Sequence, residues 1–232
     1  MSYSKLTINN RSFIKKVSHK KRFDVSQKLI ERYTKDSILD FGTGDGYLLT
    51  QLAKDNLNLQ IHGYEPLEYM FNELQENVNT SGSKNINISM TLDNNKDASF
   101  ETVCCFEVLE HFTTDAQKTH LQAIKKLLKP NGTLIISVPL EIGLSSLLKN
   151  SIRILVKQRH SNTTFKSIMR AFFGRSIKRT QTGYIYSHIG FSHKDLETIF
   201  REEGLTILKK SYSPIPWLYG LLNSQVFYVL KK

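Results

Sequence analysis

Short apolar runs alternate along the chain with segments whose apolar residues recur every three or four positions. The runs predict strands, and the helical spacing predicts helices between them. Strands are expected at residues 37–41, 59–64, 85–90, 100–106, 133–138, 206–212 and 225–230. Helices are expected at residues 22–33, 47–54, 66–77, 115–128 and 192–204. This alternation predicts an α/β fold with a doubly wound sheet of seven strands, most of them parallel.

Three stretches modify this regular pattern. Residues 141–187 follow the C-terminal end of strand five, so we expect a helical insertion on the ligand side of the sheet. Residues 1–36 predict a basic helical segment ahead of the main domain, which spans residues 37–232. The link at residues 213–224 is too short for a helical crossover, so the last strand is expected to be antiparallel.

Charge is concentrated in two of these stretches. The chain has 232 residues and a net charge of +11, with +7 in residues 1–36 and +8 in residues 141–187. A basic surface attracts nucleic acid, anionic lipid or a phosphorylated substrate, although it can also serve solubility alone. The sequence contains no separate RNA-binding module and no arginine-glycine tract, so nucleic acid is not the expected partner.

The sequence also predicts the compartment. The two cysteines, Cys104 and Cys105, are adjacent and cannot form an ordinary disulfide with each other. The start of the chain lacks the apolar core of a signal peptide, and no apolar stretch is long enough to span a membrane. We therefore expect a cytoplasmic protein, with peripheral membrane contact as an open alternative.

The insertion at residues 141–187 has two predicted helices, each apolar on one side and basic on the other. The apolar positions are Leu144, Leu147, Leu148, Ile152, Leu155 and Val156, then Phe165, Ile168, Met169, Phe172 and Phe173. The basic positions are Lys149, Arg153 and Lys157, then Lys166 and Arg170. Such helices either form a lid over the substrate or lie on anionic lipid, and the lid is favoured. The apolar loop at residues 214–222 is expected beside the same opening.

A glycine-rich loop follows the first predicted strand. Gly42, Gly44 and Gly46 alternate with other residues, and Tyr47 stands where a nicotinamide-binding fingerprint needs its third glycine. A loop of this kind between a strand and a helix brings the backbone close to a ligand at the C-terminal edge of the sheet. Glu65 closes the second strand, where a carboxylate suits a ribose diol.

These residues resemble the class I S-adenosylmethionine-dependent methyltransferases. The resemblance continues through Phe106–His111 after strand four and Leu128–Leu134 before strand five, so four motifs occur in the family's order. It implies a Rossmann-like form of the predicted sheet and S-adenosylmethionine as the cofactor. The cofactor-binding residues that it implies are Asp40, Gly42, Thr43, Gly44, Gly46, Glu65, Asp93 and Phe106. Asp93 can also be an ordinary turn residue.

Methyl transfer to a hydroxyl requires a group that accepts its proton. The candidates are Glu107, Glu110 and His111 after strand four, together with His188. The first three would share one face if this segment were a helical turn. The element resembles ubiquinone-pathway O-methyltransferases and small-RNA 2′-O-methyltransferases, some of which bind a divalent metal. We keep His111, Glu107 and His188 as catalytic candidates and assign no metal ligand.

The sequence therefore predicts methyl transfer to a small-molecule or lipid-linked acceptor, with oxygen as the favoured acceptor atom. An RNA methyltransferase is the alternative enzyme. A catalytically silent subunit of the same fold, binding a membrane or a partner, is the alternative from another class of protein.

Overall fold

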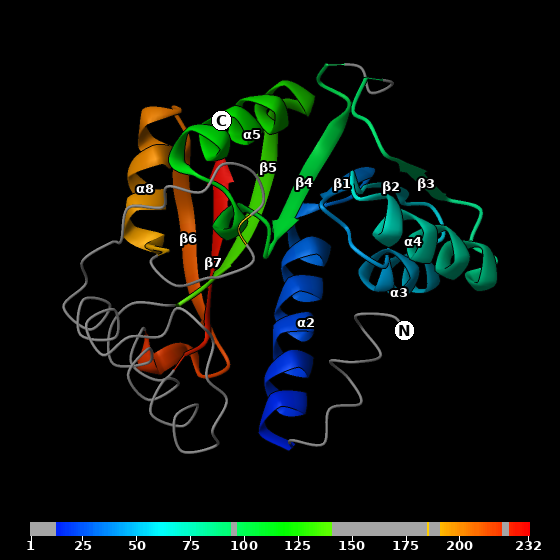
Figure 1. Cartoon of the computed structure of the whole chain (residues 1–232), viewed down its shortest axis with the longest axis horizontal. Helices are drawn as coiled ribbons and strands as arrows, with labels where there is room; N and C mark the ends of the chain where they lie inside the picture. The colour runs from blue at the N-terminus through cyan, green and yellow to red at the C-terminus, as the bar shows by residue number, and fades with distance from the viewer. Residues whose placement is uncertain (1–12, 94–96, 141–184, 186–190, 220–222) are drawn as a thin grey trace.

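The computed structural model describes residues 13–93, 97–140, 185, 191–219 and 223–232 (Figure 1). Seven strands form one sheet in the order β3-β2-β1-β4-β5-β7-β6. They are β1 Ser37–Phe41, β2 Gln60–Tyr64, β3 Ile86–Ser89, β4 Phe100–Phe106, β5 Leu128–Pro139, β6 Thr206–Ser213 and β7 Gln225–Lys231. Neighbouring strands are parallel from β3 to β5, and β7 is antiparallel to both β5 and β6. The predicted sheet with an antiparallel last strand is confirmed.

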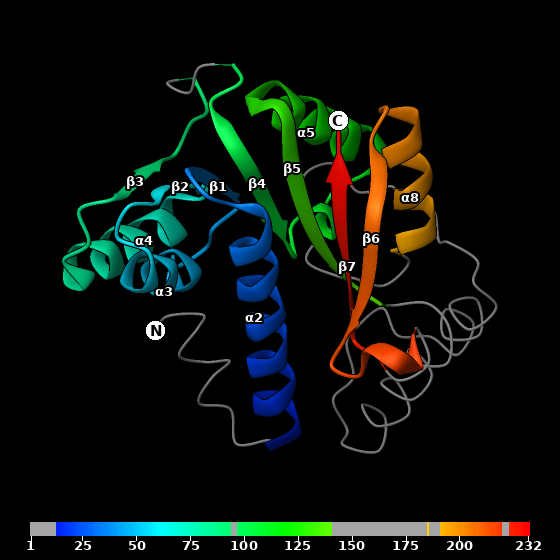
Figure 2. The same cartoon turned by 180° about the vertical axis from the view of Figure 1, so that it is seen from behind.

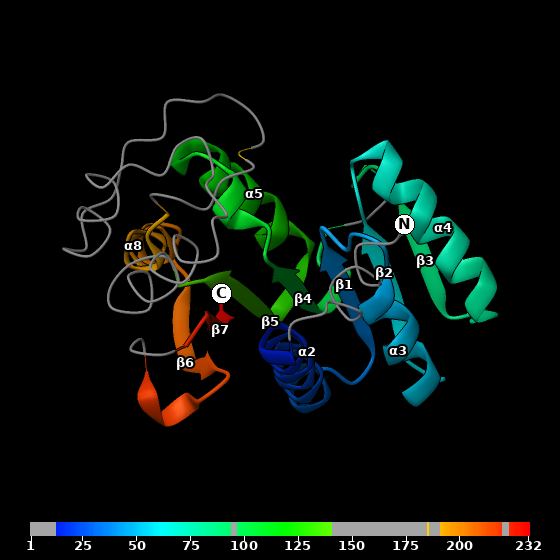
Figure 3. The same cartoon turned by 60° about the horizontal axis from the view of Figure 1, so that its bottom comes forward.

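Helices cover both faces of this sheet. They are α2 Phe13–Tyr33, α3 Tyr47–Asp55, α4 Glu68–Ser81, α5 Thr114–Leu127 and α8 His193–Glu202, with short 3₁₀ turns η1 Leu109–His111 and η2 Pro216–Leu218. Buried side chains of α2, α3 and α4 share one hydrophobic cluster with the sheet, and those of α5 and α8 share a second. Figures 2 and 3 show α2 on one side of the strands and α5 on the other.

Strand β5 contributes to both hydrophobic clusters. Leu134, Ile136 and Val138 pack in the cluster with α5 and α8, while Ile135 packs in the cluster with α2 and α3. Successive side chains of a strand point to opposite faces, so a strand covered on both faces is apolar throughout. The adjacent Cys104 and Cys105 in β4 follow the same rule, and both are free and buried.

Two element boundaries differ from the prediction by five residues or more. Helix α2 begins at Phe13 rather than Arg22, because the lysines of residues 13–21 favour a helix even where no apolar stripe marks it. Helix α5 ends at Leu127, close to its predicted end, but strand β5 begins at Leu128 and not at residue 133. The turn residues 129–132 instead produce a register shift within the β4–β5 pair, where Phe100 pairs with Leu128 and Thr102 with Thr133. Asn131 takes the left-handed conformation there, with φ of 62°.

The start of α8 matches its prediction. Ser192 precedes the helix, and its side-chain oxygen accepts a hydrogen bond from the backbone N–H of Asp195 at 3.2 Å. This contact satisfies one of the amides that a helix start leaves without an intrahelical partner.

The predicted helices of the insertion and the candidate His188 lie outside the described residues. No helix within the described part of the chain is both long enough and apolar enough to cross a membrane.

Candidate active site

The glycine loop joins β1 to α3 at the C-terminal edge of the sheet. Gly42, Gly44 and Gly46 all have positive φ, at 80°, 60° and 73°. A Cβ on Gly42 would lie 2.5 Å from Val108 Cγ2, and one on Gly46 would clash with Leu74. A Cβ on Gly44 would meet nothing within 4 Å. The outer glycines are therefore required by packing, whereas Gly44 presents its backbone to open space where a ligand can approach.

Glu65 ties this loop to the end of β2. Its Oε2 accepts a hydrogen bond from Gly44 N at 2.9 Å, and its Oε1 accepts one from Leu67 N at 3.0 Å. Burial raises the pKa of Glu65, and these two backbone hydrogen bonds partly offset the rise. A carboxylate has about four acceptor positions, so Glu65 retains capacity for ligand hydroxyls.

Asp40 is the second buried carboxyl of the loop region and lies within β1. Burial raises its pKa to about 7; Thr43 acts to lower that pKa and the charge of Glu65 to raise it. Asp40 and Glu65 are each 4 % exposed, so both are nearly shielded from bulk water. A cationic group bound at this edge would stabilise the ionised form of either carboxyl.

The other two residues expected at the cofactor lie at neighbouring strand ends. Asp93 is exposed; burial raises the pKa of Tyr64, the last residue of β2, and the charges of Glu65 and Asp93 add to the rise. Phe106 ends β4 and meets the ring of Phe227 edge-on, with ring centroids 6.2 Å apart. The structure thus places the expected cofactor residues at the ends of β1, β2 and β4 or on the loops that follow β1 and β3.

After β4, the chain does not form the single helical turn that would align the catalytic candidates. Glu107 has φ of 55°, and only Leu109–His111 form the turn η1. The side chain of Glu107 forms an ion pair with Arg22 of α2 and accepts a hydrogen bond from Gln225 Nε2 at 3.1 Å. Glu110 is fully buried, unlike the half-buried Glu107. These two carboxylates therefore have different surroundings.

His111 is held by a short backbone contact with Ile185. Its Nδ1 lies 2.7 Å from the carbonyl oxygen of Ile185, and its own carbonyl accepts a hydrogen bond from Ile185 N at 2.8 Å. A carbonyl oxygen can only accept, so Nδ1 must carry the proton and the neutral ring has its lone pair at Nε2.

Comparison with known proteins identifies the family. Residues 15–210 match the sequence model of a family described as a methyltransferase domain. The chain belongs to this family. It is a class I S-adenosylmethionine-dependent methyltransferase, and S-adenosylmethionine is its methyl donor. A search of curated proteins finds no match to the chain.

Solved structures share the fold of this methyltransferase at low sequence identity. A SAM-dependent methyltransferase from Aquifex aeolicus has a TM-score of 0.59 and 16% identity, with 92% of each chain covered. Magnesium protoporphyrin IX methyltransferase from Synechocystis PCC 6803 has a TM-score of 0.60 and 15% identity, covering 95% of this chain and 88% of that one. The 1,6-didemethyltoxoflavin-N1-methyltransferase of Burkholderia thailandensis has a TM-score of 0.59 and 14% identity, covering 99% of this chain and 85% of that one.

The methyltransferase has further residues at this edge that the sequence did not indicate. Gln225 Nε2 also donates to Ser137 Oγ at 2.8 Å, so residues from α2, β5 and β7 meet around Glu107. The sequence indicated Arg22 only through the basic charge of residues 1–36, and no pattern in it indicated that Ser137 or Gln225 lies at the site. Among the described residues, no three His, Cys, Asp or Glu side chains come together as a metal site.

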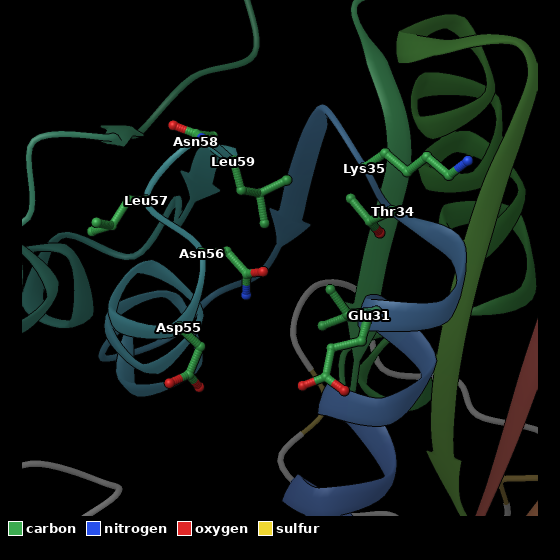
Figure 4. Close-up of a pocket in the computed structure, with 9 residues that line it drawn as sticks. Glu31, Thr34, Lys35, Asp55, Asn56, Leu57, Asn58 and Leu59 are labelled. Carbon is green, nitrogen blue, oxygen red and sulfur yellow. The ribbon is translucent and has the colours of Figure 1, made fainter.

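A pocket of about 270 Å³ lies at the opposite edge of the sheet. It is lined by Ile30, Glu31, Thr34, Lys35, Asp55, Asn56, Leu57, Asn58 and Leu59. Figure 4 shows the carboxylates of Glu31 and Asp55 facing each other across it. These residues come from the ends of α2 and α3 and from the links into β1 and β2. Ligands of open α/β sheets bind beyond the carboxyl ends of the strands, so this pocket is not the donor site of the methyltransferase.

Proposed function

We propose that this methyltransferase transfers the methyl group to a hydroxyl oxygen of a small-molecule acceptor, with His111 as the proton acceptor. The hydrogen bond between His111 Nδ1 and the Ile185 carbonyl oxygen carries this proposal. It sets the tautomer in which Nε2 is basic, which is the state that a general base needs. The catalytic role of His188, the other histidine candidate, remains a prediction from the sequence, because this residue lies outside the described residues.

The donor site is proposed to use the residues of the glycine loop and the adjoining strand ends. Gly44 and Thr43 offer backbone along the donor, Glu65 accepts the two ribose hydroxyls, and Asp40 counters its positive charge. Gly42 and Gly46 allow the tight turn that brings Gly44 forward. Asp93 and Phe106 are proposed to contact the adenosine. The open space beside Gly44 supports this arrangement, because a backbone-lined cradle is what such a ligand needs.

S-adenosylmethionine supplies a methyl group already activated on a sulfonium. The protein therefore has to orient the acceptor, exclude water and remove one proton. His111 Nε2 takes that proton, and the Ile185 carbonyl stabilises the charged ring that results. Glu107 is better suited to position Arg22 and Gln225 than to act as a base, because its carboxylate is already bound by both.

The neighbours support a small acceptor. The Burkholderia enzyme is described with bound 1,6-didemethyltoxoflavin and S-adenosylhomocysteine, and the Synechocystis enzyme is a magnesium protoporphyrin IX methyltransferase with bound SAH. Both are small-molecule enzymes of the same fold. A lipid-linked acceptor is compatible with the same site if its reacting hydroxyl reaches His111.

Donor binding is tested by calorimetry with S-adenosylhomocysteine. The native protein should release heat on binding, and Gly44→Arg should abolish that heat because its side chain fills the open space. Gly82→Arg is the matched control, since Gly82 also has positive φ and a Cβ there would meet no atom within 4 Å, yet it ends α4 away from the loop. Equal binding by both variants would contradict the proposed donor site.

The acceptor is tested with methyl-labelled S-adenosylmethionine and a panel of phenols, sugars, amines and RNA. We expect label in hydroxyl compounds, and His111→Gln should lower kcat/KM by about 10²–10⁴ while leaving S-adenosylhomocysteine affinity unchanged. His62→Gln, a half-buried histidine on β2, is the matched control. Label only in amines or RNA, or full activity of His111→Gln, would overturn the proposal.

A further inference from the structure

The link between β6 and β7 carries two large aromatic side chains that point into solvent. Trp217 is 73 % exposed and Tyr219 is 68 % exposed. They belong to residues 215–219, here called the aromatic turn, which includes η2. Exposing two large aromatic residues within one turn is unfavourable in water, so a surface of this kind indicates an interaction site.

Asn223 holds the aromatic turn in a defined shape. This residue is fully buried; its Oδ1 accepts a hydrogen bond from Ile215 N at 2.6 Å, and its Nδ2 donates to the carbonyl oxygens of Ile215 and Tyr219. Tyr219 has φ of 47°, an uncommon conformation for a residue with a Cβ. Hydrogen bonds from a buried side chain thus fix the backbone of the turn, while the rings of Trp217 and Tyr219 stay exposed to solvent. The ring of Tyr219 also meets that of Tyr212, with ring centroids 5.9 Å apart.

The aromatic turn lies on the same edge of the molecule as the start of the basic helix α2 (Figures 1 and 2). Lys20 and Lys21 lie in the N-terminal half of this helix and are exposed, and residues 1–36 carry +7 of the total charge of +11. This is also the edge that carries the glycine loop. The exposed aromatic residues and the exposed lysines therefore belong to two elements at one edge of the protein.

We propose that the aromatic turn and the N-terminal half of α2 dock on an anionic lipid surface. Tryptophan and tyrosine prefer the boundary between lipid headgroups and acyl chains, because their rings are apolar and their N–H and O–H groups remain hydrogen-bonded. Lysines near such a surface add electrostatic attraction to anionic headgroups. Docking in this way turns the donor edge of the sheet toward the lipid. The proposal does not depend on the identity of the acceptor.

Trp217 is the only tryptophan of the chain, so intrinsic tryptophan fluorescence reports the aromatic turn alone. Vesicles of phosphatidylcholine mixed with phosphatidylglycerol should shift the emission to the blue and sediment with the protein. Pure phosphatidylcholine vesicles should do neither at the same lipid concentration. Unchanged emission with anionic vesicles would overturn the proposal. So would a shift that follows protein concentration or added total RNA instead of lipid, since it would indicate self-association or RNA binding.

Variants separate the two contributions to docking. Trp217→Ala should weaken vesicle binding by about tenfold or more, as expected for one lost aromatic side chain. Tyr69→Ala is the matched control, since Tyr69 is 60 % exposed on α4. Lys20→Glu with Lys21→Glu should also weaken binding by about tenfold or more. Lys54→Glu with Lys84→Glu makes the same charge change at other exposed positions and should have a smaller effect. Equal losses in test and control variants would overturn the proposal.

Calorimetry with S-adenosylhomocysteine shows that each variant is folded, because this ligand binds at the glycine loop and not at the aromatic turn. Vesicle docking that persists in Gly44→Arg would show that lipid binding does not require the donor site.

Discussion

At the scale of single residues, Asp40 has the largest consequence for pH. Burial raises the pKa of its carboxyl to about 7 in the folded protein, well above the ordinary value of 3.8. At a pH between these two values, the folded protein therefore keeps the carboxyl proton of Asp40, whereas the unfolded chain has lost it. The contribution of Asp40 to the free energy of unfolding is complete at low pH and decreases as the pH rises from about 4 to about 7.

Replacing Asp40 by Asn removes this dependence. Relative to the native protein, Asp40→Asn should become more stable as the pH rises from about 5.5 to about 8.5, by on the order of 2 kcal/mol. Urea unfolding at the two pH values measures the difference. A constant difference between the two proteins would show that Asp40 does not titrate in this range.

Donor affinity should depend on pH through the same carboxyl. S-adenosylmethionine is cationic, so it favours ionised Asp40, and its binding should strengthen between pH 6 and pH 8 by up to about tenfold. In Asp40→Asn, affinity should be weaker and its pH dependence smaller. Calorimetric titrations across this range provide the test, and an affinity that falls as the pH rises would contradict the role of Asp40.

At the scale of elements, α2 connects the two loops of the candidate site. Arg22 forms an ion pair with Glu107 after β4, and the ring of Phe23 lies 5.2 Å from that of Tyr47 at the start of α3. The C-terminal part of α2 is anchored differently, by Leu29 and Ile30 in the hydrophobic core. Two polar or partly exposed contacts thus hold the middle of the helix beside the glycine loop, whereas its end is fixed by burial.

Removal of the Arg22 charge should loosen this part of the helix. Arg22→Gln should shorten the residence time of S-adenosylhomocysteine severalfold and destabilise the protein by about 1 kcal/mol, because the ion pair is partly exposed. Stopped-flow displacement and hydrogen exchange of residues 20–33 measure these effects.

The control for Arg22→Gln is Lys28→Gln, which removes an exposed charge from the same helix. A double-mutant cycle with Glu107→Gln isolates the pairwise contribution. Strictly additive effects of the two substitutions would show that the ion pair does not couple α2 to the site.

At the scale of the whole molecule, one sheet joins two hydrophobic clusters into a single cooperative unit. β5 pairs with β4 on one side and β7 on the other, and its side chains enter both clusters. The two helical layers therefore cannot lose their packing independently of the central strands.

Ile135→Ala in β5 should lower the free energy of unfolding by about 2–5 kcal/mol, because this fully buried side chain would leave a cavity. Leu208→Ala on the edge strand β6 should change it by only about 0.5 kcal/mol, since Leu208 is 53 % exposed. Calorimetry should show one transition for both variants. Two separated transitions would mean that the layers unfold independently.

Local patterns predicted many elements because their determinants lie within a few residues. The strand bounds Ser37–Phe41 and Phe100–Phe106 follow from apolar runs, and the start of α8 follows from the capping chemistry of Ser192. The predicted start of a strand was wrong where the same residue pattern is compatible with two structures. The residues Lys129–Gly132 are typical of a turn, and tertiary pairing with β4 accommodates that turn inside a strand.

The sequence by itself determined the fold, the glycine loop and the family, because the motif of Asp40, Gly42, Gly44, Gly46 and Glu65 depends on local backbone geometry and short spacing. Only the tertiary structure brought Arg22, Ser137 and Gln225 around Glu107, and placed the Ile185 carbonyl against His111. These partners are far apart along the chain, and their meeting depends on the order of strands in the sheet and on the packing of α2. No local pattern contains that information.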